Sequence, residues 1–181
     1  MYPQEVKYRR APNLERRFYA FLIDYITVWL FSSLVRNIFL EFIVFVFLWF
    51  ILRVIVVSVN KGQSLGRWAM DLKIMDARFQ RIPPAHILAK REAIIAFISF
   101  LAMVGLKINF HDFLLMLLLL VPVILDGIGV LIDEEGKRAF HDRFCDTIVV
   151  PTQRGISLDL KIKKLWRQAK QNWLSRETNR R

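Results

Sequence analysis

Hydrophobic residues in this chain gather in long runs, and most of the charged residues lie between the runs. Four runs are long enough, or nearly so, to cross a bilayer: residues 18–35, 38–59, 93–110 and 113–132. A helix of about 20 apolar residues spans a hydrocarbon core of roughly 30 Å. The pattern therefore predicts an all-α integral membrane protein built on a bundle of four transmembrane helices. The third run is the shortest, because only residues 93–106 are strictly apolar, and a re-entrant segment is its alternative.

The segments between the runs predict smaller elements. Residues 1–13 form a polar arm, and Leu65, Trp68, Ala69 and Leu72 recur at the spacing of a short interfacial helix. Residues 72–75 and 147–150 have the composition of short strands that could pair as a small β-ribbon. Residues 152–181 predict a basic amphipathic helix that either lies on anionic lipid headgroups or docks onto a partner subunit. Its candidate binding residues are Lys161, Lys163, Lys164, Trp166, Arg167, Lys170 and Trp173.

Positive charge is distributed unevenly along the chain. Lysine and arginine number 5 in residues 1–17, 7 in residues 60–92 and 12 in residues 133–181, whereas the two predicted loops on the other side hold only Arg36 and Lys107. The positive-inside rule then places both termini and the central loop in the cytoplasm. The membrane we expect is a bacterial or organellar membrane of the cytoplasmic type. This orientation and attraction to anionic lipid also account for the net charge of +11, so we expect no nucleic-acid partner.

The chain carries no recognisable catalytic pattern, since it lacks a P-loop, GxSxG, HExxH and CxxC. The single cysteine, Cys145, excludes an internal disulfide framework. His141 and Cys145 have the i, i+4 spacing that a helix could offer to a metal, but a turn with a hydrogen-bonded His141-Asp142 pair is the favoured interpretation. We therefore expect no enzyme activity, no cofactor and no metal site.

Three ionisable residues lie inside the apolar runs: Asp24, Arg53 and Asp126. Each is seven residues, or about 10 Å, from the predicted cytoplasmic boundary. Arg53 is expected to meet Asp24, with Asp126 as a second possible partner, unless it extends to the headgroups instead. Either the three charges lock the bundle as a structural staple, or the surplus carboxylate forms a proton or cation site.

Several blocks of the sequence resemble the RDD family of small membrane proteins, over residues 14–151. They are Arg17-x-x-Ala20-x-x-Ile23-Asp24, then Lys61–Arg67 and Leu72–Asp76, and finally His141–Phe144 followed by Asp146–Val150. The arginine and two aspartates that name the family correspond to Arg17, Asp24 and Asp142. The resemblance also covers Gly62, Gly66, Arg91 and His141, whereas Phe144-Cys145-Asp146 departs from the small residues that often follow the His-Asp motif.

The resemblance implies a polytopic membrane protein with a proposed role in transport, including cation/proton exchange, and it does not imply any enzyme activity. Two functions stay open at this point. In one, the chain is a small transporter or transporter subunit, in a homo-oligomer or a larger membrane complex. Asp24 and Asp126 would then bind the cation or proton, and Arg53 would gate it by competition. In the other, the chain is a non-catalytic scaffold or assembly factor whose basic tail engages lipid or a partner.

Overall fold

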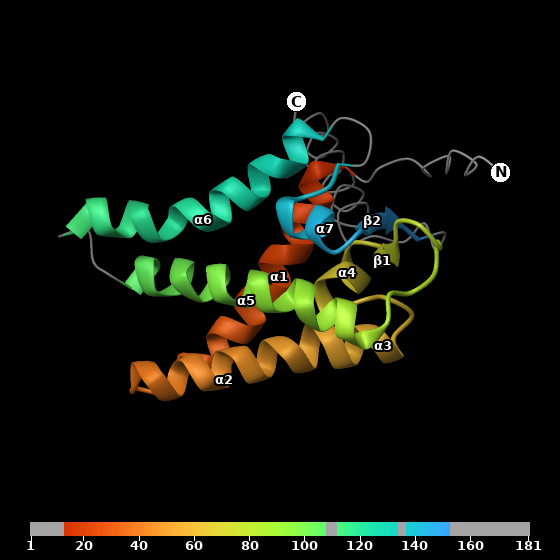
Figure 1. Ribbon diagram of the computed structural model, residues 1–181. Helices are drawn as coiled ribbons and strands as arrows, with labels where there is room; N and C mark the ends of the chain where they lie inside the picture. The colour runs from red at the N-terminus through yellow and green to blue at the C-terminus, as the bar shows by residue number, and fades with distance from the viewer. Residues whose placement is uncertain (1–12, 108–111, 134–136, 153–181) are drawn as a thin grey trace, which may run out of the picture.

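The structure is a computed structural model that describes residues 13–107, 112–133 and 137–152 (Figure 1). Its elements, in chain order, are α1 (Leu14–Ser32), α2 (Ile38–Phe50), η1 (Ile51–Ile55), α3 (Val56–Val59), α4 (Leu65–Ala69), β1 (Leu72–Asp76), α5 (Ala85–Lys107), α6 (Phe113–Ile132), α7 (Phe140–Phe144) and β2 (Thr147–Pro151). The segment 153–181, with its seven candidate lipid- or partner-binding residues, lies outside the described residues, as does most of the predicted N-terminal arm.

Each of the four apolar runs forms a long helix. α2, η1 and α3 follow one another without a break and together cover the second run. The side-chain oxygen of Asn37 begins α2, because it accepts hydrogen bonds from the backbone N–H groups of Phe39 and Leu40. α5 starts at Ala85, directly after Pro83-Pro84, because the charged residues 85–92 form a helical entry that continues into the third run.

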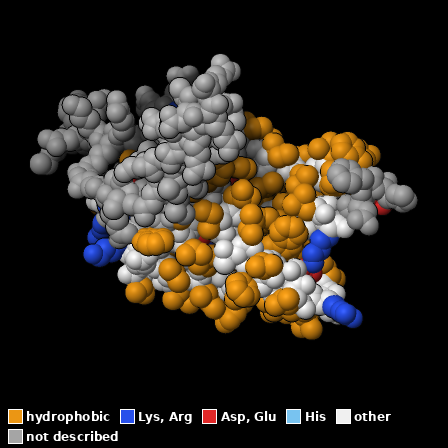
Figure 2. Space-filling view, turned by 180° about the vertical axis from the view of Figure 1, so that it is seen from behind, with side chains coloured by type: hydrophobic (Ala, Val, Ile, Leu, Met, Phe, Trp, Pro, Cys, Tyr) orange, Lys and Arg blue, Asp and Glu red, His pale blue; other side chains and the backbone are white. Residues whose placement is uncertain are grey.

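Two of these helices are long and apolar enough to cross a membrane. They are Ile38–Val59, with 22 residues, and Phe113–Ile132, with 20 residues. In the most apolar 18-residue stretch of Phe113–Ile132, only 11% of the residues are buried against the rest of the described structure. Leu114 on α6 is 80% exposed and Leu118 is 64% exposed. Figure 2 shows hydrophobic side chains spread over the visible face of the molecule, with Lys and Arg at its ends. Apolar surface on this scale is typical of a face that meets lipid or another protein. That α1 and α5 also cross the membrane stays a prediction.

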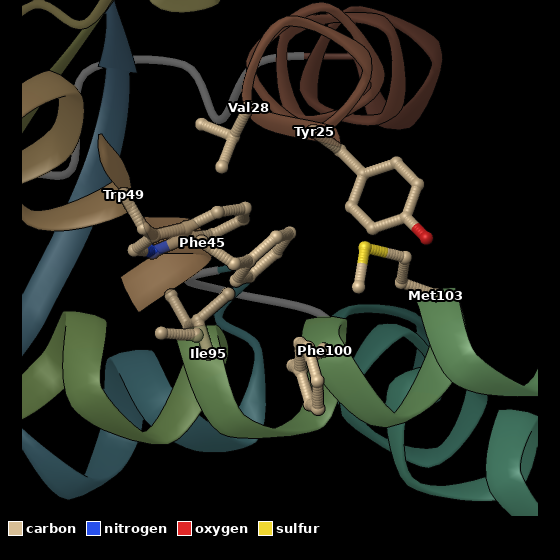
Figure 3. Close-up of a cluster of buried hydrophobic side chains, with 8 residues drawn as sticks. Tyr25, Val28, Phe45, Trp49, Ile95, Phe100 and Met103 are labelled. Atoms are coloured by element: carbon tan, nitrogen blue, oxygen red, sulfur yellow. The ribbon is translucent and has the colours of Figure 1, made fainter. Parts of the chain in front are cut away.

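The largest hydrophobic core joins α1, α2 and α5. Tyr25 and Val28 from α1 face Phe45 and Trp49 from α2, and Ile95, Phe100 and Met103 of α5 close the cluster (Figure 3). Tyr25 of α1 meets Phe45 of α2 edge-on with ring centroids 6.5 Å apart, and Phe42 of α2 meets Phe100 of α5 edge-on at 4.8 Å. Aromatic pairs of this kind hold three helices in a fixed arrangement.

The short elements gather at one end of the long helices (Figure 1). β1 and β2 pair antiparallel, with Lys73 opposite Val150, so the predicted β-ribbon is confirmed. The predicted short helix is also present as α4, and Leu72 lies beyond its end as the first residue of β1. The ribbon, α4 and α7 therefore bring two segments that are distant in the sequence, residues 60–76 and 139–151, against the same ends of α1 and α5.

Candidate functional site

A π-helical turn, η1, places the first of the predicted buried charges. A π turn inserts one extra residue into an α-helix and changes the direction of the side chains that follow. Arg53 lies in this turn and is only 4% exposed. Its Nη1 donates to Asp24 Oδ2 at 2.9 Å, and its guanidinium lies 4.9 Å from the ring centre of Trp49. The predicted Arg53–Asp24 pair is therefore present, and Arg53 does not extend to the surface.

The carboxylate of Asp24 is fully engaged. Besides Arg53, it accepts from the Ser64 hydroxyl at 2.6 Å and from the Gly66 backbone N–H at 2.7 Å. Gly66 makes this contact possible, because a Cβ at that position would overlap the carbonyl oxygen of Ala20. Asp24 thus ties α1 to the start of α4, and the Gly62/Gly66 spacing serves close packing within the chain.

Glu92 is the centre of the charge network, and sequence reasoning did not select it. Its carboxylate accepts from Arg53 Nε at 2.7 Å and Arg67 Nη2 at 3.1 Å, and it also pairs with Arg91. Trp49 Nε1 adds a fourth donor at 3.2 Å. The sequence did contain a signal that could have identified Glu92. It is an acid that follows Arg91 and directly precedes an apolar run, where an uncompensated charge would be costly.

Arg67 belongs to the same network but has spare donors. It is 3% exposed, and its Nη1 has no hydrogen-bond partner among the described residues. Burial lowers the pKa of Arg67 to about 9, and repulsion from Arg53 and Arg91 adds to this shift while Glu92 and Asp24 oppose it. A buried guanidinium with unsatisfied N–H groups is an energetic cost that a bound anion would relieve.

Asp142 joins the two arginines of the family motif. Arg17 Nη2 pairs with one carboxylate oxygen, and Arg91 donates to the other from Nε at 2.9 Å and Nη2 at 2.7 Å. Burial alone would raise the pKa of Asp142, but Arg91, His141 and Arg17 together hold it well below its usual value. Asp142 is therefore a permanent carboxylate that fixes α7 against α1 and α5.

Asp126 does not meet Arg53, so this part of the prediction is wrong. It lies 2.6 Å from His141 Nδ1 and also accepts from the His141 backbone N–H at 3.2 Å. The physical reason is that depth along a helix does not fix direction: α6 turns this residue towards α7, and α7 supplies the partner. Asp24, Arg53 and Asp126 are still connected, but only through Glu92, Arg91 and His141.

His141 lies among three polar side chains. Its Nδ1 lies 2.6 Å from Asp126 Oδ2, and its Nε2 lies 3.0 Å from Arg91 Nη2 and 3.2 Å from Asp142 Oδ1. The predicted His-Asp turn is a helix, α7, in which His141 contacts Asp126 and Arg91 more closely than Asp142. Burial raises the pKa of the neighbouring Cys145 thiol, which is 8% exposed. Within the described ranges, no three His, Cys, Asp or Glu side chains are grouped closely enough to hold a metal.

A cavity of about 640 Å³ adjoins this network between α1, α5 and α6. Its walls are mostly apolar, with Phe21 from α1, Ile95 and Leu106 from α5, and Leu120 and Ile124 from α6. At one end it is lined by polar side chains: Arg17, Arg53, Arg67, Arg91, Asp126 and His141. Asp24, Glu92 and Asp142 lie behind the arginines and do not line it. The arrangement can hold a molecule and present guanidinium groups and one His–Asp pair to it.

Comparison with known proteins agrees with the resemblance in the sequence. A model of the RDD family matches residues 11–146, whereas no curated protein and no solved structure matches the chain. The match covers most of the chain and includes Arg17, Asp24, Gly62, Gly66, Arg91, His141 and Asp142, and it ends at residue 146, before the last four residues of the Asp146–Val150 block. Together with the apolar helices, it points to a membrane protein. The chain belongs to the RDD family.

Proposed function

We propose that this protein is a small membrane transporter, or the transport subunit of a larger membrane complex, in which the His141–Asp126 pair takes up and releases a proton. The observation that carries the proposal is the position of this pair, 2.6 Å apart, in the wall of the cavity between α1, α5 and α6. Histidine is the side chain that titrates closest to neutral pH. An intramembrane carboxylate paired with histidine is a common element of proton relays.

Protonation of His141 would change its contacts in a defined way. In the neutral form, Nε2 accepts from Arg91, and a proton on Nε2 would make this contact repulsive. The same nitrogen lies 3.2 Å from Asp142 Oδ1, which can accept the new N–H. A proton arriving from the cavity would therefore exchange Arg91 for Asp142 as the partner of Nε2. This links protonation to the contacts between α5 and α7.

The contacts of Asp24 argue against a cation site at that residue. Its carboxylate has three donors, and arginine side chains separate it from the cavity. We therefore assign the proton-handling role to His141 and Asp126, and we give Asp24 and Arg53 a structural role.

The experiment is proton flux into liposomes that contain the purified full-length chain. An imposed pH gradient, followed with an enclosed pH-sensitive dye, should collapse faster than in empty liposomes. His141→Gln should abolish this excess rate, and Asp126→Asn should lower it at least about tenfold, in the range of a lost proton-transfer group. His86→Gln and Asp112→Asn are matched controls at exposed positions and should leave the rate unchanged. A wild-type rate equal to that of empty liposomes would overturn the proposal.

The saturation of the network favours a second candidate, a membrane scaffold or assembly factor. Asp24, Glu92 and Asp142 each have at least two cationic or N–H partners, as expected of a rigid staple. The test is purification of the full chain from its native membrane. A scaffold should bring down a defined membrane complex in fixed proportion, and loss of residues 156–181 should weaken this association.

For either function, we propose that α1, the α2–α3 helix, α5 and α6 all cross the membrane, with both termini on the cytoplasmic side. The distribution of Lys and Arg supports this orientation. The gathering of the short polar elements at one end of the long helices is consistent with it (Figure 1).

A further inference from the structure

We infer that the cavity between α1, α5 and α6 binds an anionic amphiphile, with a carboxylate or phosphate head at the arginines and an acyl chain along the apolar walls. This deepens the proposed function, since it names a substrate class for the same cavity, but binding itself does not require proton transport. The inference is built from three observations: the charge of the polar end, the spare donors of Arg67, and the shape and chemistry of the walls.

The polar end of the cavity presents mostly positive charge. Four guanidinium groups line it, whereas among the described residues Asp126 is the one carboxylate in its lining, and this residue is paired with His141. The other three carboxylates of the network are 0% exposed and are not part of the lining. A ligand at this end therefore meets guanidinium groups before it meets carboxylates, and this arrangement favours an anion over a cation.

Arg67 supplies donors that nothing else in the described structure uses. Its Nη2 bonds to Glu92, but its Nη1 is buried and has no partner among the described residues. The side chain also lines the cavity. A rotation of the Arg67 guanidinium that brings Nη1 to the cavity surface would let a carboxylate or phosphate oxygen accept a charge-assisted hydrogen bond from it.

The remaining walls suit an acyl chain. The lining side chains of α5 extend from Arg91 to Leu106, a distance of roughly 20 Å along the helix at about 1.5 Å per residue. Between these ends the walls are Ile95 and Ala102 from α5 and leucine, valine and isoleucine side chains from α6. Leu106 is 50% exposed and Ile124 is 48% exposed, so the cavity is open along the side that a membrane would cover. An amphiphile could therefore enter sideways from the lipid.

The binding test uses the purified full-length chain in neutral detergent and oleate as the probe, with bound molecules counted by native mass spectrometry. Wild-type chain should bind one oleate and should bind oleyl alcohol, which has the same chain without the charge, at least about tenfold more weakly. Phosphatidylglycerol is then added. Displacement of oleate assigns the site to an anionic phospholipid, and retention of oleate assigns it to a free acyl acid.

Two variants test the two halves of the site. Arg67→Gln removes the spare donors and should weaken oleate binding at least about tenfold, whereas Arg78→Gln, at a side chain 71% exposed, should not.

Gly127→Phe leaves every charge in place and extends into the cavity, because a Cβ at Gly127 meets nothing within 4 Å. It should block oleate, while Leu118→Phe on an exposed part of α6 should not.

Gly127→Phe keeps the inference falsifiable if Arg67→Gln does not fold. Equal binding of oleate and oleyl alcohol, or oleate binding that Gly127→Phe leaves unchanged, would overturn it. Oleate binding without proton flux would leave the inference standing and remove the proposed function. Proton flux without oleate binding would leave the proposed function standing and overturn the inference.

Discussion

At the scale of single residues, the missing side chain of Gly66 allows α4 to approach α1. We expect Gly66→Ala to destabilise the protein by about 2 kcal/mol or more, the cost of forcing extra atoms into a packed site. The added Cβ would overlap the carbonyl oxygen of Ala20 and push the Gly66 N–H away from Asp24. Thermal unfolding in mild detergent measures the effect.

Gly127→Ala is the matched control for this substitution. Gly127 also lies within a helix, but a Cβ there meets nothing within 4 Å. Alanine should therefore leave stability unchanged or raise it by up to about 1 kcal/mol, the usual helix preference over glycine. Equal effects of the two substitutions would contradict the close approach of α4 to α1.

Glu92→Gln tests whether Glu92 is the centre of the network. Loss of its charge leaves Arg53, Arg67 and Arg91 facing one another in a buried site. Breaking a buried ion pair from one side costs about 3–5 kcal/mol, whereas exposed pairs contribute about 1 kcal/mol or less. Asp146→Asn, in a pair whose side chains are 50% and 71% exposed, is the control. A small loss for Glu92→Gln, similar to that of the control, would show that Asp24 alone neutralises the arginines.

Acid should weaken the fold partly through Asp142. Since the pKa of this carboxyl is held well below its usual value of about 4, its contribution to stability is complete above that value and is lost as the pH falls towards its folded pKa. Asp142→Asn should therefore make thermal stability less dependent on pH below about pH 4 than it is in the wild type. A wild type and variant that lose stability in parallel would contradict the contacts of Asp142 with Arg17 and Arg91.

At the scale of elements, the sequence predicted much of the fold, because long apolar runs and β-branched strands are local signals. The four helices and the β-ribbon follow from such signals. The position of a residue along a helix, however, gives no direction around the helix axis, so Asp126 was assigned to Arg53 although it faces His141. Glu92 was missed for a similar reason, since its partners come from η1, α4 and its own helix.

The β-ribbon joins segments that are far apart in the sequence, and its register can be tested. Lys73 and Val150 are opposite each other in the antiparallel pair, within the separation that a disulfide can bridge. In a Cys145→Ser background, Lys73→Cys with Val150→Cys should form a disulfide on mild oxidation, seen as a mobility shift that a reductant reverses. Lys73→Cys with Ile148→Cys is the control, because Ile148 is opposite Met75. Efficient cross-linking of the control pair would indicate a different register.

At the scale of the whole molecule, the charge network and the proposed topology depend on each other. The network holds the ends of α1, η1 and α5 together with α4 and α7, so the proposed topology has to place these ends on one side of the membrane. Four crossings satisfy this condition, because the other ends of α1 and α5, and the beginnings of α2 and α6, then lie together on the opposite side. Two crossings by the α2–α3 helix and α6 alone would leave α1 and α5 at a membrane surface.

Cysteine labelling in intact cells distinguishes these arrangements. In a Cys145→Ser background, Arg36→Cys lies at an exposed position between α1 and α2, and Arg78→Cys lies at an exposed position after β1. A membrane-impermeant maleimide should label Arg36→Cys from outside and Arg78→Cys only after the membrane is opened. A third site, Asp112→Cys before α6, should label like Arg36→Cys if α5 crosses the membrane. Labelling of Asp112→Cys only in opened cells would mean that α5 does not cross. The cavity between α5 and α6 would then face the cytoplasmic boundary instead of the hydrocarbon, and lateral entry of an acyl chain would lose its physical basis.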